Sequence, residues 1–144
     1  MKRIALLFIA IVLCLSLSAC ESPGTTNHAV VDYGSSVWYT KAEIESAIKV
    51  VMKEFKDLKS CDLLRIWYDE DKTNREYAYD QKSLNSPLRG VKRENLIVLL
   101  SDFHVGSAGS ASGFSPDSTV TNFSWTLTRK SVNSPWVLYD AGYS

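Results

Sequence analysis

Apolar residues recur at helical spacing in the first half of the chain and at strand spacing in the second half. Between residues 41 and 58 they stand three or four positions apart, which places them on one face of a helix. Thr40 and Glu43 form a capping-box pattern at the start of this segment. The pattern predicts a long amphipathic helix whose core-facing residues are Ile44, Ile48, Val51, Phe55 and Leu58.

The later apolar runs predict strands. Residues 63–68 and 96–105 are rich in β-branched and aromatic side chains, and residues 123–128 alternate strictly between apolar and polar. Residues 136–140 follow a polar connection and predict the second arm of a hairpin. A shorter helix is predicted over residues 74–82. An early helix followed by antiparallel strands predicts an α+β fold, with the long helix packed across a curved, mainly antiparallel sheet.

The first nineteen residues have the pattern of a lipoprotein signal peptide. Met1-Lys2-Arg3 is positively charged, and the apolar run 4–17 is too short to span a membrane but has the length of a signal-peptide core. The next segment, Leu17-Ser18-Ala19-Cys20, resembles the bacterial lipobox. This resemblance implies cleavage before Cys20 and lipidation of its sulfur, including a palmitate-type acyl chain. An ordinary signal peptide and a buried apolar helix are the alternatives.

The rest of the chain then divides into two parts. Residues 20–37 comprise the lipidated cysteine and a small, polar segment that predicts a flexible tether. Residues 38–144 have the length of a single domain. The expected location is the extracytoplasmic face of the cell membrane, in the cell envelope, held by two acyl chains because one chain anchors only marginally.

Charge and cysteine content narrow the range of partners. The chain has 16 basic and 16 acidic residues, and loss of residues 1–19 leaves 14 and 16, a net charge of −2. Such a balance provides no general attraction to nucleic acid, so no nucleic-acid partner is expected.

Cys14 leaves with the signal peptide, so Cys61 stands without a disulfide partner. It is expected to be a small buried side chain rather than a reactive thiol.

No motif in the sequence compels a reaction. Metalloprotease, nucleophile-elbow and phosphate-loop patterns are missing from it, so no catalytic residue, metal ligand or cofactor is assigned. Asp102 and His104 lie two apart on a predicted strand and would share one face, and Trp125 is the aromatic residue expected to line a pocket with them. The acidic segment at residues 69–71 predicts a solvated turn rather than a calcium site.

The order of elements and the chain ending 136–143 resemble small uncharacterised lipoproteins of Gram-positive bacteria. The resemblance covers residues 38–143 and rests on aromatic spacing, as in Trp67-Tyr68-Asp69-Glu70 and Asn122-Phe123-Ser124-Trp125. It implies a cystatin-like or nuclear transport factor-like cone. It carries no activity and no site residue to this chain.

Three functions are therefore compared. The preferred one is a membrane-tethered extracytoplasmic lipoprotein whose non-catalytic domain binds a protein or a small apolar ligand. The second is a small enzyme that uses Asp102 and His104 in a concave sheet pocket. The third is a structural component of the envelope with only protein partners.

Overall fold

The computed structural model describes residues 21–108 and 112–143. The predicted signal peptide and the lipidation of Cys20 lie outside the described residues. The fold is α+β, as predicted, with a five-stranded mixed sheet and two α-helices. No helix among the described residues is both long and apolar enough to cross a membrane.

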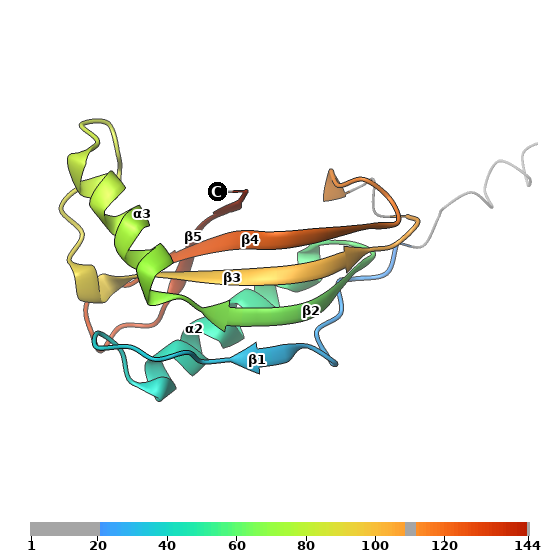
Figure 1. The fold of residues 1–144 in the computed structure, drawn as a ribbon, viewed down its shortest axis with the longest axis horizontal. Helices are drawn as coiled ribbons and strands as arrows, with labels where there is room; N and C mark the ends of the chain where they lie inside the picture. Colours follow the sequence, from blue (N-terminus) through green and yellow to red (C-terminus); the bar gives the residue numbers. More distant parts are fainter. Residues whose placement is uncertain (1–20, 109–111, 144) are drawn as a thin grey trace, which may run out of the picture.

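The strands lie side by side in the order in which they occur along the chain (Figure 1). Neighbours from β2 to β5 are antiparallel, whereas β1 runs parallel to β2. The strands are β1 (Val30–Asp32), β2 (Cys61–Tyr68), β3 (Leu96–Val105), β4 (Ser118–Thr128) and β5 (Val137–Gly142). The helices are α2 (Lys41–Glu54) and α3 (Glu70–Lys82), with short 3-10 turns η1 (Phe55–Asp57) and η2 (Arg93–Asn95).

Helix α2 begins where the capping box predicted it. The Thr40 side chain accepts a hydrogen bond from the Glu43 amide, and the Glu43 carboxylate accepts one from the Thr40 amide at 2.8 Å. The helix is shorter than predicted, because after Glu54 the chain tightens into η1. Phe55 still lies on the apolar face and is fully buried, so the shorter helix keeps the predicted stripe.

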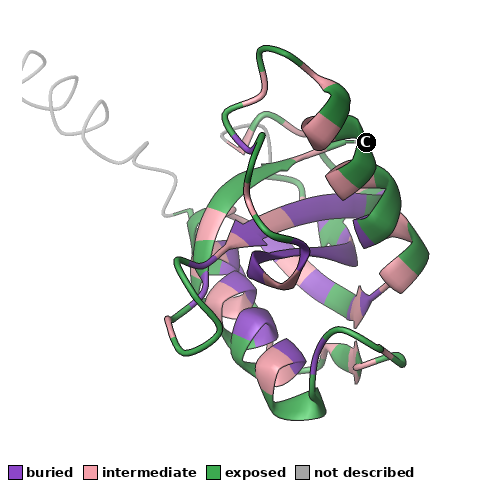
Figure 2. Ribbon diagram, turned by 90° about the vertical axis from the view of Figure 1, so that its left-hand side faces the viewer, coloured by how far each residue is buried: buried purple, intermediate pink, exposed green. Residues whose placement is uncertain are grey.

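The main core lies between α2 and one face of the sheet. Figure 2 shows buried positions concentrated on the central strands and on the sheet-facing side of α2. Fully burying one such apolar side chain contributes roughly 1.5–3 kcal/mol. The strand residues of this core include Leu63, Ile66, Ile97, Leu99, Phe103, Phe123, Trp125 and Leu127.

Helix α3 starts four residues earlier than predicted, because Asp69 is its N-cap. The Asp69 carboxylate accepts a hydrogen bond from the Lys72 amide at 2.8 Å. The predicted solvated turn is therefore the first turn of a helix, where carboxylates are favoured by the helix dipole. The helix packs on the other side of β3, where the Thr73 hydroxyl accepts a hydrogen bond from the Val98 amide at 3.2 Å.

The sheet is irregular on both sides of Asp102. The pairing register shifts between Leu63 and Arg65 on β2, and again opposite Asp102 on β4. At the second shift, Asn122 has a positive φ of 53° and its amide donates to the Asp102 carboxylate at 2.9 Å. Bulges of this kind bend a strand and increase its twist. The bulge also explains why the predicted strand began only at residue 123, whereas β4 begins at Ser118. The extra residue of the bulge interrupts the alternation of apolar and polar residues along the strand.

The segment predicted as a flexible tether is bonded to the domain over most of its length. The Gly24 amide donates to the Lys56 carbonyl at 3.0 Å, and the Thr25 amide donates to the Cys61 carbonyl at 2.9 Å. Further along, β1 pairs with residues 65–67 of β2. Its polar composition suggested mobility, but backbone hydrogen bonds to a sheet edge do not depend on side-chain chemistry.

Candidate functional site

Two arginines are buried on either side of Tyr39, at the end of the sheet where β2 finishes and β3 starts. Arg93 and Arg129 are 6% and 7% exposed, and Tyr39 is 6% exposed. The Tyr39 hydroxyl accepts a hydrogen bond from Arg93 and lies within bonding distance of the Arg93 and Leu96 carbonyls. Burial raises the pKa of Tyr39 despite the nearby positive charges, so this hydroxyl stays protonated.

Arg129 is completely partnered. Its guanidinium lies 2.8 Å from the Glu43 carboxylate and donates to the carbonyls of Glu94 and Val132 at 2.8–3.1 Å. It also lies 4.3 Å from the centre of the Trp136 ring. Its ion pair with Glu43 connects the start of α2 to the end of β4, so Arg129 has a structural role.

Arg93 is partnered differently. Its Nε donates to the Asn74 side chain at 2.8 Å, and its Nη1 donates to the Leu96 carbonyl at 3.2 Å. Its Nη2 is buried and has no hydrogen-bond partner among the described residues. Within residues 21–108 and 112–143, no carboxylate lies within ion-pair distance of Arg93. A buried donor without a partner is costly and uncommon, which singles out this side chain.

Trp38 covers the outer side of Arg93. Its ring centre lies 5.1 Å from the guanidinium carbon, and the side chain is 45% exposed. The ring quadrupole stabilises a cation without neutralising its charge. Arg93 is therefore held by neutral hydrogen-bond partners, and the acidic Glu70 acts on it through its charge without forming an ion pair with it.

The loop that carries Trp38 is held in place by hydrogen bonds of Ser36 and Glu70. The Ser36 hydroxyl donates to Glu70 at 2.6 Å and accepts from the amides of Trp38 and Tyr39 at 3.0 and 3.1 Å. The Tyr68 hydroxyl also donates to Glu70, at 3.2 Å. The Ser36 hydrogen bond is the main reason that the pKa of Glu70 lies below its ordinary value, and the charge of Arg93 contributes further.

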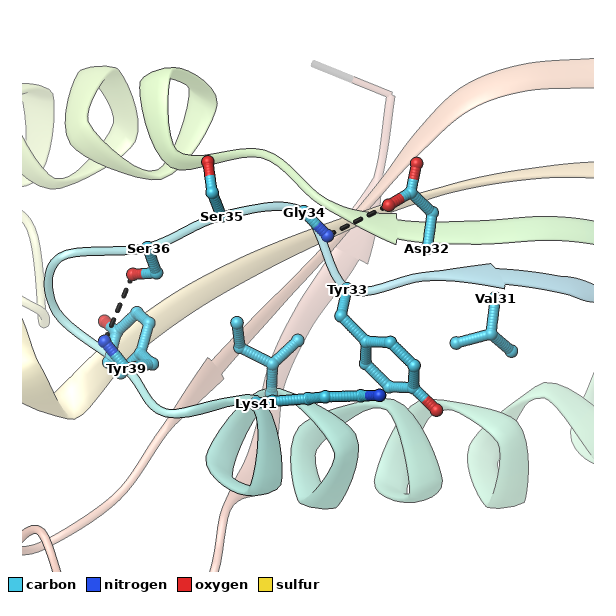
Figure 3. Close-up of a pocket in the computed structure, with 9 residues that line it drawn as sticks. Val31, Asp32, Tyr33, Gly34, Ser35, Ser36, Tyr39 and Lys41 are labelled. Atoms are coloured by element: carbon cyan, nitrogen blue, oxygen red, sulfur yellow. Dashed lines mark hydrogen bonds between the residues drawn. The ribbon is translucent and has the colours of Figure 1, made fainter.

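A groove lies between this loop and the start of α2. It has a volume of about 560 Å³ and is lined by Tyr39 together with Val31, Asp32, Tyr33, Gly34, Ser35, Ser36, Lys41 and Ile44. Figure 3 shows the side chains of Tyr33 and Lys41 directed between the strand and the helix. The Lys41 Nζ lies 4.7 Å from the centre of the Tyr33 ring.

Asp32 lies at the edge of this groove, and its charge is offset. Figure 3 shows its carboxylate on the side of the strand away from α2. It accepts hydrogen bonds from the Gly34 amide at 2.9 Å and from Arg65 at 3.1 Å, and these, in that order of size, lower the pKa of Asp32. Lys41 has no ion-pair partner among the described residues, so of the two charged side chains that line the groove only the positive one is not offset.

The structure does not bring Asp102, His104 and Trp125 into one pocket. Trp125 is 2% exposed, faces α2 and donates through Nε1 to the Ser101 hydroxyl at 2.8 Å. Because side chains alternate along a strand, Asp102 and His104 lie on the other face. His104 is exposed and lines a separate groove of about 410 Å³ at the start of β2, and Asp102 is not among the lining residues. The carboxylate of Asp102 is engaged by the bulge at Asn122.

The buried state expected for Cys61 is confirmed. The side chain is 3% exposed, and burial raises the pKa of the thiol, which disfavours the reactive thiolate. Among the described residues, no three His, Cys, Asp or Glu side chains are placed to hold a metal ion.

The arginine pair and the groove were not found from the sequence. Arg93 and Arg129 stand among other charged and polar residues, and neither belongs to a periodic apolar pattern that would predict its burial. Their burial depends on contacts with residues far away in the sequence, such as Tyr39 with Arg93 and Glu43 with Arg129. A single sequence carries no signal for such pairs.

Comparison of the chain with protein-family models, with curated proteins and with solved structures finds no match.

Proposed function

We propose that the protein is a membrane-anchored lipoprotein of the extracytoplasmic face, whose domain binds a ligand without catalysing a reaction. The anchor is Cys20, at the end of a short positive segment, an apolar run and a lipobox-like motif. The order of these features at the start of the chain supports the anchor. The expected modification is a lipid on the Cys20 sulfur and an acyl chain on its amine.

The groove at Tyr39 is the proposed binding site, and the unpaired positive charge of Arg93 behind it is the observation that carries the proposal. Tyr39 lines the groove and is hydrogen-bonded to Arg93 on its other side. Lys41 adds a second positive charge at the rim. A buried charge without an ion-pair partner attracts an opposite charge more strongly than the same charge does in water.

The ligand is therefore a polar molecule with an acidic group rather than a small apolar one. The aromatic side chains that favoured an apolar ligand, such as Phe103, Phe123 and Trp125, are buried in the core against α2. The Ser35 hydroxyl at the groove supplies a polar contact, whereas the Ser36 hydroxyl is already bonded to Glu70 and to the amides of Trp38 and Tyr39. Among the described hydrogen bonds, none joins the hydroxyl of Ser35 or Ser36 to Asp32 or Lys41, so the groove holds no nucleophile activated by a base that lines it, which supports binding over catalysis.

We further propose that the curved sheet with α2 across it belongs to the cystatin-like or nuclear transport factor-like cones. The packing of α2 across a sheet whose strands β2 to β5 run antiparallel in sequence order supports this class, as does the aromatic spacing that resembles small lipoproteins of Gram-positive bacteria. An experimental structure that superposes on neither class would overturn it.

Mass spectrometry of the protein from native membranes tests the anchor. We expect an acylated N-terminal peptide that begins at Cys20. In a Cys20→Ala variant this peptide disappears and the protein leaves the membrane fraction. An unmodified mature terminus contradicts the anchor.

Calorimetric titration with succinate, and with neutral succinamide as its matched control, tests the binding site. We expect succinate to bind and succinamide not to bind. Lys41→Gln should weaken succinate binding about tenfold, because it removes one groove charge. Lys53→Gln, on the exposed side of the same helix, should leave binding unchanged. Equal binding of both probes, or equal effects of the two substitutions, contradicts an acidic ligand.

A further inference from the structure

The first described residues are fastened to the domain immediately after the proposed lipidation site. The Ser60 amide donates to the Ser22 carbonyl at 2.8 Å, and the Gly24 amide donates to the Lys56 carbonyl at 3.0 Å. Two more backbone bonds hold Thr25 against β2, from its amide to the Cys61 carbonyl and from the Leu63 amide to its carbonyl, both at 2.9 Å. The Thr25 hydroxyl is hydrogen-bonded to Asp62 as well.

Gly24 is the tightest point of this attachment. It is buried, and a Cβ at this position would lie 2.3 Å from the Phe55 carbonyl oxygen and 2.8 Å from that of Leu58. Both neighbours are backbone atoms, one in η1 and one directly after it, so they cannot move aside as a flexible side chain would. Only glycine allows the chain to approach η1 this closely.

The length of chain between the lipid and the first bond is therefore very short. If Cys20 is residue one of the mature protein, only Glu21 separates it from Ser22. Two residues span at most about 7 Å, even when fully extended. A flexible tether made of all seventeen residues 21–37 would instead reach roughly 20 Å and would leave the domain free to turn.

We infer that the end of the domain formed by Ser22, Lys56 and Ser60 faces the lipid bilayer, with no flexible tether between them. This inference rests on the proposed lipid anchor. It makes the membrane surface the partner of this end of the sheet. The groove at Tyr39 lies at the opposite end of α2 and points into the extracytoplasmic space.

The two ends are far enough apart for the orientation to be measured. Glu43 at the start of α2 is paired with Arg129, next to Lys130, whereas Lys56 lies just beyond its other end. The thirteen positions from Glu43 to Lys56 correspond to about 20 Å at a helical rise of about 1.5 Å per residue. Lys56 and Lys130 are both exposed, so each can carry a label.

Quenching of a fluorescent label by nitroxide lipid headgroups tests the orientation. The acylated full chain carries the label at Lys56→Cys or at Lys130→Cys and is reconstituted in phosphatidylcholine vesicles. Both substitutions remove one lysine, and the native Cys61 is buried from the reagent. We expect several-fold stronger quenching of the Lys56→Cys label. Equal quenching of the two labels contradicts a fixed orientation.

Two further variants separate attachment from anchoring. Inserting about eight Gly and Ser residues between Glu21 and Ser22 lengthens the connection by roughly 16 Å and should bring the two labels toward equal, weak quenching. Gly24→Val should have the same effect by displacing the attached segment. The insertion leaves every domain residue in place, so it stays informative if Gly24→Val does not fold.

The outcomes also distinguish this inference from the anchor itself. Protein that is acylated at Cys20 but shows equal quenching, unchanged by the insertion, overturns the orientation and leaves the anchor standing. Protein that is not acylated, and does not partition into vesicles, overturns the anchor and the orientation together.

Discussion

Arg93 and Arg129 lie on either side of Tyr39 and are almost equally buried, yet only one of them has a carboxylate partner. Arg129 has Glu43 at 2.8 Å and three further hydrogen bonds to backbone carbonyls. Arg93 is held by an amide, a hydroxyl and a carbonyl, and one of its nitrogens has no partner among the described residues. The contrast indicates that one arginine joins elements of the fold and the other maintains a positive charge beside a groove.

Removing Arg129 should have the largest effect. Arg129→Met leaves the Glu43 carboxylate and the Glu94 and Val132 carbonyls without their partner, and breaking such a buried pair costs about 3–5 kcal/mol. Urea unfolding at pH 7 measures the loss. Lys130→Met, at the exposed next position, is the control and should change stability by less than about 0.5 kcal/mol. A loss at Arg129 no larger than that of the control would show that the pair is not structural.

Removing Arg93 should cost less than removing Arg129, about 1–2 kcal/mol. Arg93→Met loses the hydrogen bonds to Asn74 and Leu96, but it also removes a buried charge and an unpartnered donor, which offsets part of the loss. The same urea titration compares the two arginines directly. If Arg93→Met destabilises the domain as much as Arg129→Met does, the distinction between the two arginines fails.

The pH dependence of stability should reflect the same difference. Burial raises the pKa of Glu43. The hydrogen bonds from Thr40 and Arg129, together with the charge of Arg129, lower this pKa by more, so the folded-state pKa lies below its ordinary value. A lowered folded pKa stabilises the native state above the ordinary value of 4.5, and this stabilisation disappears as the pH falls through the folded pKa. Stability should therefore fall less steeply between about pH 5 and pH 3 in Glu43→Gln than in the unsubstituted protein. Unfolding curves that stay parallel across this range would contradict the pairing.

Trp38→Ala should have the smallest effect on stability. The ring is 45% exposed and its main contact is with the Arg93 guanidinium, so the loss is about 0.5–1 kcal/mol. Thermal unfolding followed by circular dichroism measures it. Trp136→Ala provides the contrast, because Trp136 is 5% exposed and donates to the Glu43 carbonyl at 3.1 Å, and its loss should be at least 3 kcal/mol, as for other buried aromatics. Equal losses would show that Trp38 is part of the core.

The elements built from local signals could be predicted from the sequence. The α+β class, the start of α2 at its capping box, the long apolar strand β3 and the hairpin of β4 with β5 all follow from patterns within a few residues. The errors are also local. The N-cap at Asp69 was hidden among three consecutive acidic residues, and the bulge at Asn122 interrupted the alternation by which β4 was recognised.

The site could not be predicted, because long-range contacts create it. Strand β1 is formed by three residues of a polar segment that pair with β2 more than thirty positions away. The groove exists because this strand and its loop lie beside α2. Conversely, the spacing of Asp102 and His104 predicts that they share one face, but spacing alone does not show whether a cavity lies there.

The dependence of stability on succinate concentration tests the claim about Arg93 most directly. At constant ionic strength, a ligand that binds only the native state raises the free energy of unfolding with its concentration. We expect succinate to stabilise the unsubstituted protein and the Lys130→Met control, and to have little effect on Arg93→Met. If succinate stabilises Arg93→Met as much as the unsubstituted protein, Arg93 does not provide the charge that the ligand recognises.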